Sequence, residues 1–169
     1  MSHAKNKVDW CLKKAERELK EFGKHRGLVK TEPDLNKAKE HISKAEHYLK
    51  ATDYLKKGKF SDISASTVFY SMYHSLLAIT VKFGYESRNQ ECTLALVHSL
   101  ISEGKVDIEK ELLNKVASLN IEKTNEKTSV DIREQYQYGT SLSIKDDLYE
   151  ELFELAKELI SKAKVIIEE

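Results

Sequence analysis

The chain has 169 residues, of which 40% are hydrophobic and 33% are charged, and its formal net charge is zero. This length predicts a single domain, and the apolar fraction is too high for a disordered chain and sufficient for a core without disulfides or metals. One proline and six glycines are too few for the turns of an all-β fold, and the zero net charge does not indicate a strongly basic nucleic-acid binder.

A helix is predicted from about Lys5 to Phe22. Apolar residues recur in this segment at steps of three and four, which places them in one stripe along the helix. The stripe consists of Val8, Cys11, Leu12, Ala15 and Leu19. A short basic connection with glycines at positions 23 and 27 follows and ends the helix.

Two longer helices are predicted next. Thr31 is expected to cap the first of them, with Pro33 in its first turn, and this helix ends near Lys57. Ser61 opens the other, which ends near Phe83 and is apolar around its whole circumference. Because a helix of this kind is buried on all sides, we expect it to be the central helix of a bundle.

Four further helices complete the prediction. Three of them span residues 91–101, 107 to about 119 and 129 to about 138, with a polar loop over 120–128, and the last follows Ser143 and runs to the end. Ser143 and Asp146 resemble a capping box for the last helix. No segment alternates at period two for long enough to form a strand. The predicted fold class is therefore all-α, an antiparallel helical bundle of six to seven helices.

Cys11 and Cys92 are the only cysteines, and their spacing fits no zinc motif. Two free, buried thiols in a reducing cytosol are the resulting prediction, which gives a cytoplasmic location. The lysine-rich N-terminus lacks the apolar core of a signal peptide, and the densest apolar run, 76–81, is far shorter than the ~20 residues that span a bilayer. No metal is predicted because no histidines have ligand spacing, and no cofactor because the glycines form no phosphate loop.

The zero net charge conceals an uneven distribution along the chain. Residues 1–60 carry 16 basic and 9 acidic side chains, whereas residues 61–169 carry 12 basic and 19 acidic ones. Solvated helix faces explain such a pattern without any function. The alternative is self-association, in which the basic face of one subunit meets the acidic face of another.

One candidate site lies in the segment 69–74 of the central helix. Tyr70, Tyr73 and His74 share a helix face because they are spaced at i, i+3 and i+4. The favoured interpretation is a core in which each hydroxyl or ring nitrogen finds a buried partner. In the alternative interpretation, Tyr70 and His74 line a groove beside the central helix.

A second candidate lies in the segment 131–139. Arg133 stands near Tyr136 and Tyr138, and such a set can grip a phosphate between a guanidinium fork and stacking rings. The alternative is an arginine paired with a neighbouring carboxylate on an exposed helix. In a third segment, 85–93, Asn89 is expected to cap a helix rather than to form part of a binding loop, and Cys92 as a nucleophile is a disfavoured alternative.

Three runs of the sequence together resemble a HEPN domain, named for higher eukaryotes and prokaryotes nucleotide-binding. The runs are Ala45–Ala51, Phe60–Ser66 and Phe69–Ala78, and the segment from Arg133 to Gly139 stands where that family places its arginine-containing motif. The resemblance covers roughly residues 35–168. It divides the chain into an N-terminal helical extension, 1–30, and a HEPN-like bundle, 31–169.

The resemblance implies a bundle that dimerises around a groove, and many relatives are metal-independent ribonucleases with an arginine and a histidine four to six residues apart. Arg133 matches the arginine, but the fifth position after it is Tyr138, and no histidine follows His98. A tyrosine with an ordinary pKa near 10 is a poor proton shuttle at neutral pH. The resemblance therefore implies a non-catalytic homodimer that binds a nucleotide or RNA. The cluster of arginine and aromatic residues predicts that the binding residues are Arg133, Tyr136, Tyr138, His74 and Tyr70.

The same resemblance implies partners and an alternative activity. The ribonuclease relatives belong to toxin–antitoxin or defence systems, and relatives without the arginine–histidine pair bind nucleotides or RNA, or partner a small nucleotidyltransferase. The alternative function is a ribonuclease with altered acid and base residues, for example His74 acting together with Arg133. Whether the protein is an enzyme stays open at this point, and a binding module is the favoured interpretation.

Overall fold

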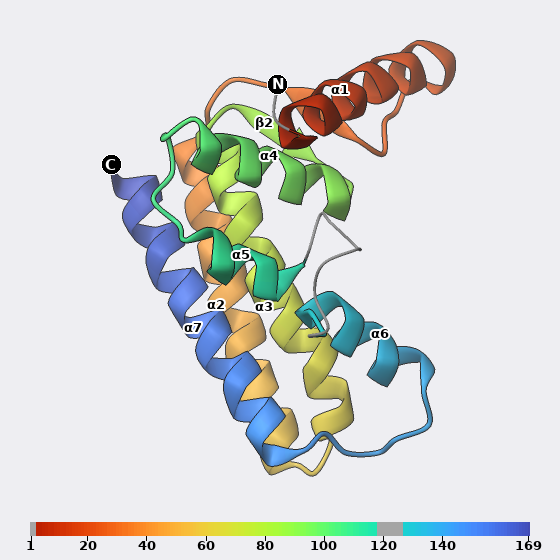
Figure 1. Ribbon diagram of the computed structural model, residues 1–169, viewed down its shortest axis with the longest axis vertical. Helices are drawn as coiled ribbons and strands as arrows, with labels where there is room; N and C mark the ends of the chain where they lie inside the picture. The colour runs from red at the N-terminus through yellow and green to blue at the C-terminus, as the bar shows by residue number, and fades with distance from the viewer. Residues whose placement is uncertain (1–2, 118–126) are drawn as a thin grey trace.

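A computed structural model describes residues 3–117 and 127–169 (Figure 1). The described residues form seven helices and one two-stranded sheet, which confirms the predicted all-α bundle. The elements in chain order are α1 (His3–Phe22), β1 (Leu28–Lys30), α2 (Leu35–Lys57), α3 (Ser61–Lys82), β2 (Tyr85–Ser87), α4 (Gln90–Ser102), α5 (Lys110–Val116), α6 (Ser129–Tyr138) and α7 (Asp146–Glu168).

Helix α3 lies at the centre of the bundle and contacts α2, α4, α6 and α7. Its side chains Met72, Leu76 and Ile79 are completely buried. One face of α3 is nevertheless open: Ile63 is 47% exposed, and Tyr70 is only partly buried. The prediction that this helix is enclosed on all sides was therefore wrong along that face, because no other helix of the described chain covers it.

The long helices do not all alternate in direction. Figure 1 shows that α2 runs antiparallel to α3, whereas α7 runs in the same direction as α3. Because α3 and α7 run in the same direction, the chain must return from the end of α3 to the other end of the bundle before α7 begins. Helices α4, α5 and α6 lie on this return path.

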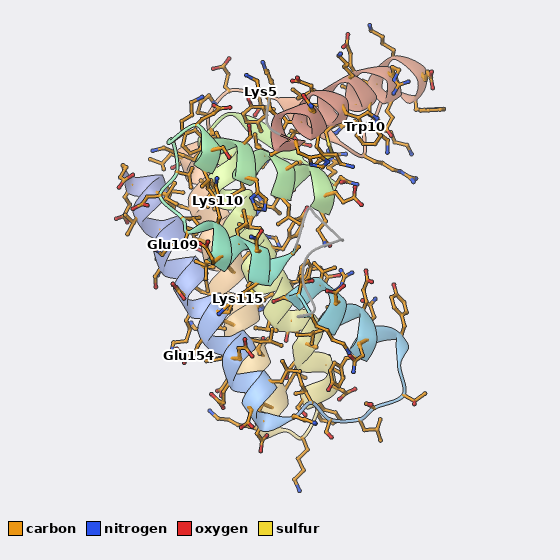
Figure 2. All side chains as sticks on the ribbon, in the orientation of Figure 1. Lys5, Trp10, Glu109, Lys110, Lys115 and Glu154 are labelled. Carbon is orange, nitrogen blue, oxygen red and sulfur yellow. A yellow bond between two sulfur atoms is a disulfide. The ribbon has the colours of Figure 1, made fainter. Side chains whose placement is uncertain are left out.

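Charged side chains cover the outer helix faces, as Figure 2 shows. Some of them join the basic N-terminal part of the chain to the acidic C-terminal part, including ion pairs of Lys7 with Glu91 and of Lys56 with Asp146. These ion pairs neutralise part of the uneven charge of the two parts within a single chain. Exposed ion pairs of this kind contribute little to the stability of the fold.

A short antiparallel sheet joins the segments before α2 and after α3. Leu28 pairs with Ser87 and Lys30 pairs with Tyr85. The sequence analysis predicted no strand, because three residues are too few to show period-two alternation. Gly84 turns the chain into β2 with a φ of +75°, and a Cβ at this position would lie 2.8 Å from the carbonyl oxygen of Thr31.

Several predicted helix ends are shifted. Asp34, not Thr31, caps α2, because its side chain accepts a hydrogen bond from the backbone N–H of Lys37 at 2.9 Å. The expected capping box of Ser143 is absent: Lys145 precedes α7 without a side-chain cap. Helix α5 spans Lys110–Val116, so both predicted ends, 107 and 119, were wrong: the backbone is already extended at Ala117. Most of the predicted loop 120–128 falls outside the described residues.

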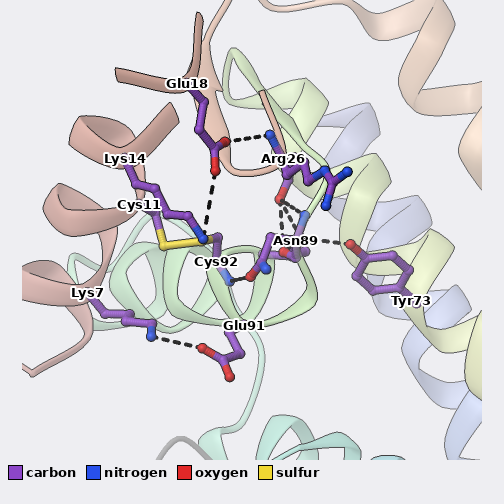
Figure 3. The surroundings of a disulfide bond; sticks show 11 residues. Lys7, Cys11, Lys14, Glu18, Arg26, Tyr73, Asn89, Glu91 and Cys92 are labelled. Carbon is purple, nitrogen blue, oxygen red and sulfur yellow. Dashed lines mark hydrogen bonds and ion pairs between the residues drawn. A yellow bond between two sulfur atoms is a disulfide. The ribbon is translucent and has the colours of Figure 1, made fainter. Parts of the chain in front are cut away.

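Helix α1 is fastened to the bundle by a disulfide between Cys11 and Cys92 of α4 (Figure 3). Both residues are buried, as predicted, but the prediction of free thiols was wrong. The two cysteines are 81 positions apart, so only the packing of α1 against α4 brings their Cα atoms to 5.9 Å. An ion pair of Lys7 with Glu91 supports the same contact, and a hydrogen bond from the backbone N–H of Arg26 to Glu18 ties the connection after α1 back to this helix.

Candidate functional site

Half-buried histidine and tyrosine side chains lie together on the open face formed by α2 and α3. The Nδ1 atoms of His41 in α2 and His74 in α3 are 2.9 Å apart, which is a hydrogen bond between the two rings. Tyr48 stacks on His74 with ring centroids 5.6 Å apart and an interplanar angle of 19°, and it lies at the same centroid distance from Tyr70. Residues 41 and 48 share one face of α2 because they are seven positions apart.

Both histidines of this pair are shifted toward the neutral form. Burial, together with the nearby His41 and Lys44, lowers the pKa of His74 to about 4. Burial and Lys37 also lower the pKa of His41, against the opposite effect of Glu40. Two neutral imidazoles can share one hydrogen bond, in which one ring donates and the other accepts. At neutral pH these rings therefore act as neutral stacking and hydrogen-bonding groups.

Arg133 of α6 lies against the central helix. Its guanidinium carbon is 4.7 Å from the centroid of the Phe69 ring, and its Nη2 donates to Glu134 at 3.1 Å. The side chain is only 15% exposed, and its Nε is buried without a hydrogen-bond partner. An exposed, paired arginine and a phosphate-binding arginine were the two interpretations of this segment. The structure shows the pair with Glu134, but the side chain is mostly enclosed and its Nε has no partner.

Phe69 connects the arginine to the aromatic face. Its ring lies 5.6 Å from that of Tyr70 and stacks on that of Tyr73, with centroids 6.0 Å apart. A continuous series of ring contacts therefore runs from Arg133 through Phe69, Tyr70 and Tyr48 to the histidine pair. We call this series the ring row; it consists of Phe69, Tyr70, Tyr48, His74 and His41.

Tyr136 and Tyr138, the other two residues of the predicted site, lie elsewhere on α6. Tyr136 is half-buried and lines a pocket of about 940 Å³ between α5, α6 and α7, together with Lys115 and Leu152. Tyr138 is 78% exposed. Within the described part of the chain, neither tyrosine has a hydrogen bond or ring contact with Arg133. The structure thus links Arg133 to Tyr70 through Phe69, and to His74 only through the further rings of Tyr70 and Tyr48, and it does not bring the two late tyrosines to Arg133.

The third predicted segment has a structural role. Asn89 caps α4, as expected, by accepting a hydrogen bond from the backbone N–H of Cys92 at 3.0 Å. The hydroxyl of Thr93 links Ser87 to the phenol of Tyr73. Burial raises the pKa of Tyr73, whereas the bond to Thr93 lowers it. Cys92 as a nucleophile is wrong, because its sulfur belongs to the disulfide.

Sequence reasoning missed His41, Tyr48 and Phe69 as members of the site. The spacing of His41 and Tyr48 was visible in the sequence, but their use depends on how α2 lies against α3. An apolar residue in an apolar helix, such as Phe69, is predicted to be an ordinary core residue, and its side chain is indeed only 2% exposed. Its second role, as the surface beneath a guanidinium, follows only from the position of α6.

Residues 3–117 and 127–169 contain no group of three or more His, Cys, Asp or Glu side chains placed to hold a metal ion. None of the helices in the same residues is both long enough and apolar enough to cross a bilayer.

Comparison with known protein families decides the classification of the fold. The family model of the HEPN domain matches residues 38–168. The chain belongs to the HEPN domain family. The match runs from the first turn of α2 to the end of α7, so it includes the ring row and Arg133, whereas α1, β1 and Cys11 lie before it. No curated protein matches the chain. Membership in the HEPN family identifies the bundle in general terms as a nucleotide- or RNA-related module.

Proposed function

We propose that this HEPN protein is a non-catalytic homodimer that binds the phosphate of a nucleotide or of RNA through Arg133. The observation that carries the proposal is the guanidinium of Arg133, which is largely buried and retains an Nε without a partner. A buried donor without a partner is costly, so it is rarely kept without a use. An anion that accepts from Nε and a neighbouring Nη nitrogen satisfies this donor.

The surroundings of Arg133 suit a phosphate. Phe69 covers one side of the guanidinium and holds its plane, which leaves the edge with its N–H groups for a bidentate contact. The carboxylate of Glu134 occupies one nitrogen, but its side chain is 53% exposed and can turn into solvent when a phosphate takes its place.

The ring row supports a nucleotide over a bare phosphate. Tyr70, Tyr48 and His74 are half-buried, so part of each ring is accessible to a base. The stacking of a base on an aromatic ring contributes about 1–3 kcal/mol and tolerates any base. Tyr136 and Tyr138 remain part of the proposed site as groups that a longer RNA reaches along α6.

The absence of a suited acid–base pair supports a binding role rather than a ribonuclease. General acid catalysis needs a group that is protonated near the working pH, and His74 with a pKa of about 4 is neutral there. Incubation of the protein with structured RNA tests this point. We expect no cleavage. Cleavage that is lost in both His74→Ala and Arg133→Ala would show a ribonuclease and contradict the non-catalytic part of the proposal.

The homodimer and the protein partner are tested separately. HEPN domains commonly dimerise, which supports a homodimer. Light scattering is expected to give twice the chain mass of 19.4 kDa. A mass of one chain at micromolar concentration contradicts the homodimer.

For the nucleotidyltransferase-type partner of a toxin–antitoxin pair, we expect stable co-purification after co-expression with an encoded neighbour of that class.

The phosphate site is tested by binding of AMP and of a short RNA to two matched variants. Arg133→Gln removes the charge and the fork but keeps a similar volume. Arg88→Gln is the control, because Arg88 is an exposed arginine paired to a carboxylate, here Glu86 at 2.8 Å. Loss of a charge-assisted contact of about 1.5–3 kcal/mol weakens binding roughly 10- to 150-fold for Arg133→Gln only. Equal binding by both variants would remove Arg133 from the site.

A further inference from the structure

The outer face of α1 presents the only tryptophan of the chain to solvent. Trp10 is 47% exposed (Figure 2), and the Lys7 ammonium beside its ring also pairs with Glu91 of α4. The side of α1 that is buried consists of small or medium residues, namely Ala4, Val8, Cys11 and Ala15. The packing of α1 on the bundle therefore does not use the largest apolar side chain of this helix.

Cations surround Trp10 on the same face. The Nζ atoms of Lys7 and Lys14 lie 4.7 and 5.2 Å from the centroid of its ring. Lys13 and Arg17 stand three and seven positions after Trp10, so they continue the stripe. We call these five residues the α1 stripe. Its length from residue 7 to residue 17 is about 15 Å at the rise of an α-helix.

Part of this positive charge is not neutralised by the protein. Lys7 and Lys14 form ion pairs with Glu91 and Glu18. Lys13 and Arg17 are exposed, and the described residues contain no carboxylate within ion-pair distance of either. Exposed carboxylates at Asp9, Glu16 and Glu21 stand on the same helix, so the cations left for a ligand are Lys13 and Arg17 beside the indole.

The position of α1 relative to the bundle is fixed. The disulfide joins the middle of the helix to α4, and Glu18 accepts a hydrogen bond from the backbone of Arg26 after the helix ends (Figure 3). A flexible basic tail would have to be ordered on binding, at a cost in entropy. The α1 stripe is ordered before any ligand arrives.

We propose that the α1 stripe is a binding surface for single-stranded nucleic acid. Bases stack on the indole of Trp10, and backbone phosphates pair with Lys13 and Arg17. Proteins that bind single strands without sequence preference use this combination of aromatic platforms and a cationic track. The side chains of Lys7 and Lys14 are flexible, so a base can replace their ammonium groups at the ring while these groups move to phosphates.

This surface goes beyond the proposed function, because it lies outside the HEPN match and shares no residue with the Arg133 site. It stands if Arg133 binds nothing. The chemistry of the two surfaces also differs: Arg133 offers a single buried fork, whereas the α1 stripe offers exposed charges and one ring. Binding at the α1 stripe is therefore expected to depend strongly on salt.

Fluorescence of Trp10 tests the proposal directly, because no other tryptophan contributes to the signal. The protein is titrated with an unstructured 12-nucleotide RNA in the Arg133→Gln background, which separates this surface from the Arg133 site. We expect quenching on binding. The double variant Lys13→Gln/Arg17→Gln should bind at least tenfold more weakly. The slope of the logarithm of the binding constant against the logarithm of the salt concentration should become smaller in magnitude by about 1.4, because two phosphate contacts are lost. The anisotropy of labelled RNA should show weaker binding to Trp10→Leu.

A double variant on α2, Lys39→Gln/Lys50→Gln, is the control, because it removes the same charge from two exposed lysines. It is expected to bind like the parent protein. Equal weakening by the control, or RNA binding without any change in Trp10 fluorescence, overturns the proposal. A fluorescence change that depends on protein concentration in the absence of RNA would show that a second copy occupies the face, and it overturns the proposal as well.

Discussion

Reduction of the bond between Cys11 and Cys92 is expected to lower the free energy of unfolding by about 4.5 kcal/mol. The bond closes a loop of 81 residues, and the chain-entropy model assigns this value to a loop of that length, mainly because the cross-link restricts the unfolded chain. Small domains unfold with only about 5–15 kcal/mol, so the bond accounts for a large part of the total.

The assay is urea unfolding of the oxidised and the reduced protein, followed by circular dichroism. At a typical dependence of about 2 kcal/mol per molar urea, the midpoint is expected to fall by roughly 2 M on reduction. The double variant Cys11→Ala/Cys92→Ala should unfold near the reduced protein and should not respond to the reductant. Identical midpoints with and without reductant, together with two titratable thiols in the oxidised sample, would refute the reasoning.

Three further changes are expected to alter stability. Acidification from pH 7 to pH 4 should destabilise the protein: the pKa of His74 is lowered to about 4 on folding, so the unfolded chain binds the proton first and stability is lost as the pH falls below the unfolded value near 6.5. For this half-exposed ring the loss is about 1–2 kcal/mol after screening, and His74→Gln should reduce the pH dependence measured by urea midpoints; an unchanged dependence contradicts the lowered pKa. Leu76→Ala should cost about 2–5 kcal/mol at a fully buried position, against under 1 kcal/mol for Ile63→Ala on the open face; equal costs would show that the two faces of α3 are not different. Gly84→Ala should lower the thermal midpoint more than Gly104→Ala, because both glycines have a positive φ but only a Cβ at 84 meets a carbonyl oxygen; a larger effect at Gly104 contradicts this geometry.

Local sequence patterns predicted the helices well, since their signals lie within one element. The apolar content of α3 indicated its central place, and Asn89 and Gly139 marked the start of α4 and the end of α6. Predictions failed where distant segments decide the structure. The pairing of β1 with β2 joins two three-residue segments that carry no periodic signal. The disulfide depends on the packing of α1 against α4.

The candidate site was predictable in part for the same reason. Arg133 stood out by its residue type among aromatic neighbours, and the resemblance to HEPN domains pointed to the same segment. The hydrogen bond of His41 to His74 and the contact of Arg133 with Phe69 cross between helices, so no spacing within one segment shows them. Tyr136 and Tyr138 are close to Arg133 in the sequence, but α6 turns Tyr136 toward the pocket beside α5 and α7.

The Nε–H signal of Arg133 in a nitrogen–proton NMR spectrum reports most directly on the proposed phosphate contact. Its assignment follows from the signal that disappears in Arg133→Lys. On titration with AMP, the account predicts a large shift of this signal and no shift of the corresponding signal of Arg88. If the Arg133 signal stays in place while AMP saturates the protein, the buried guanidinium is not the phosphate site.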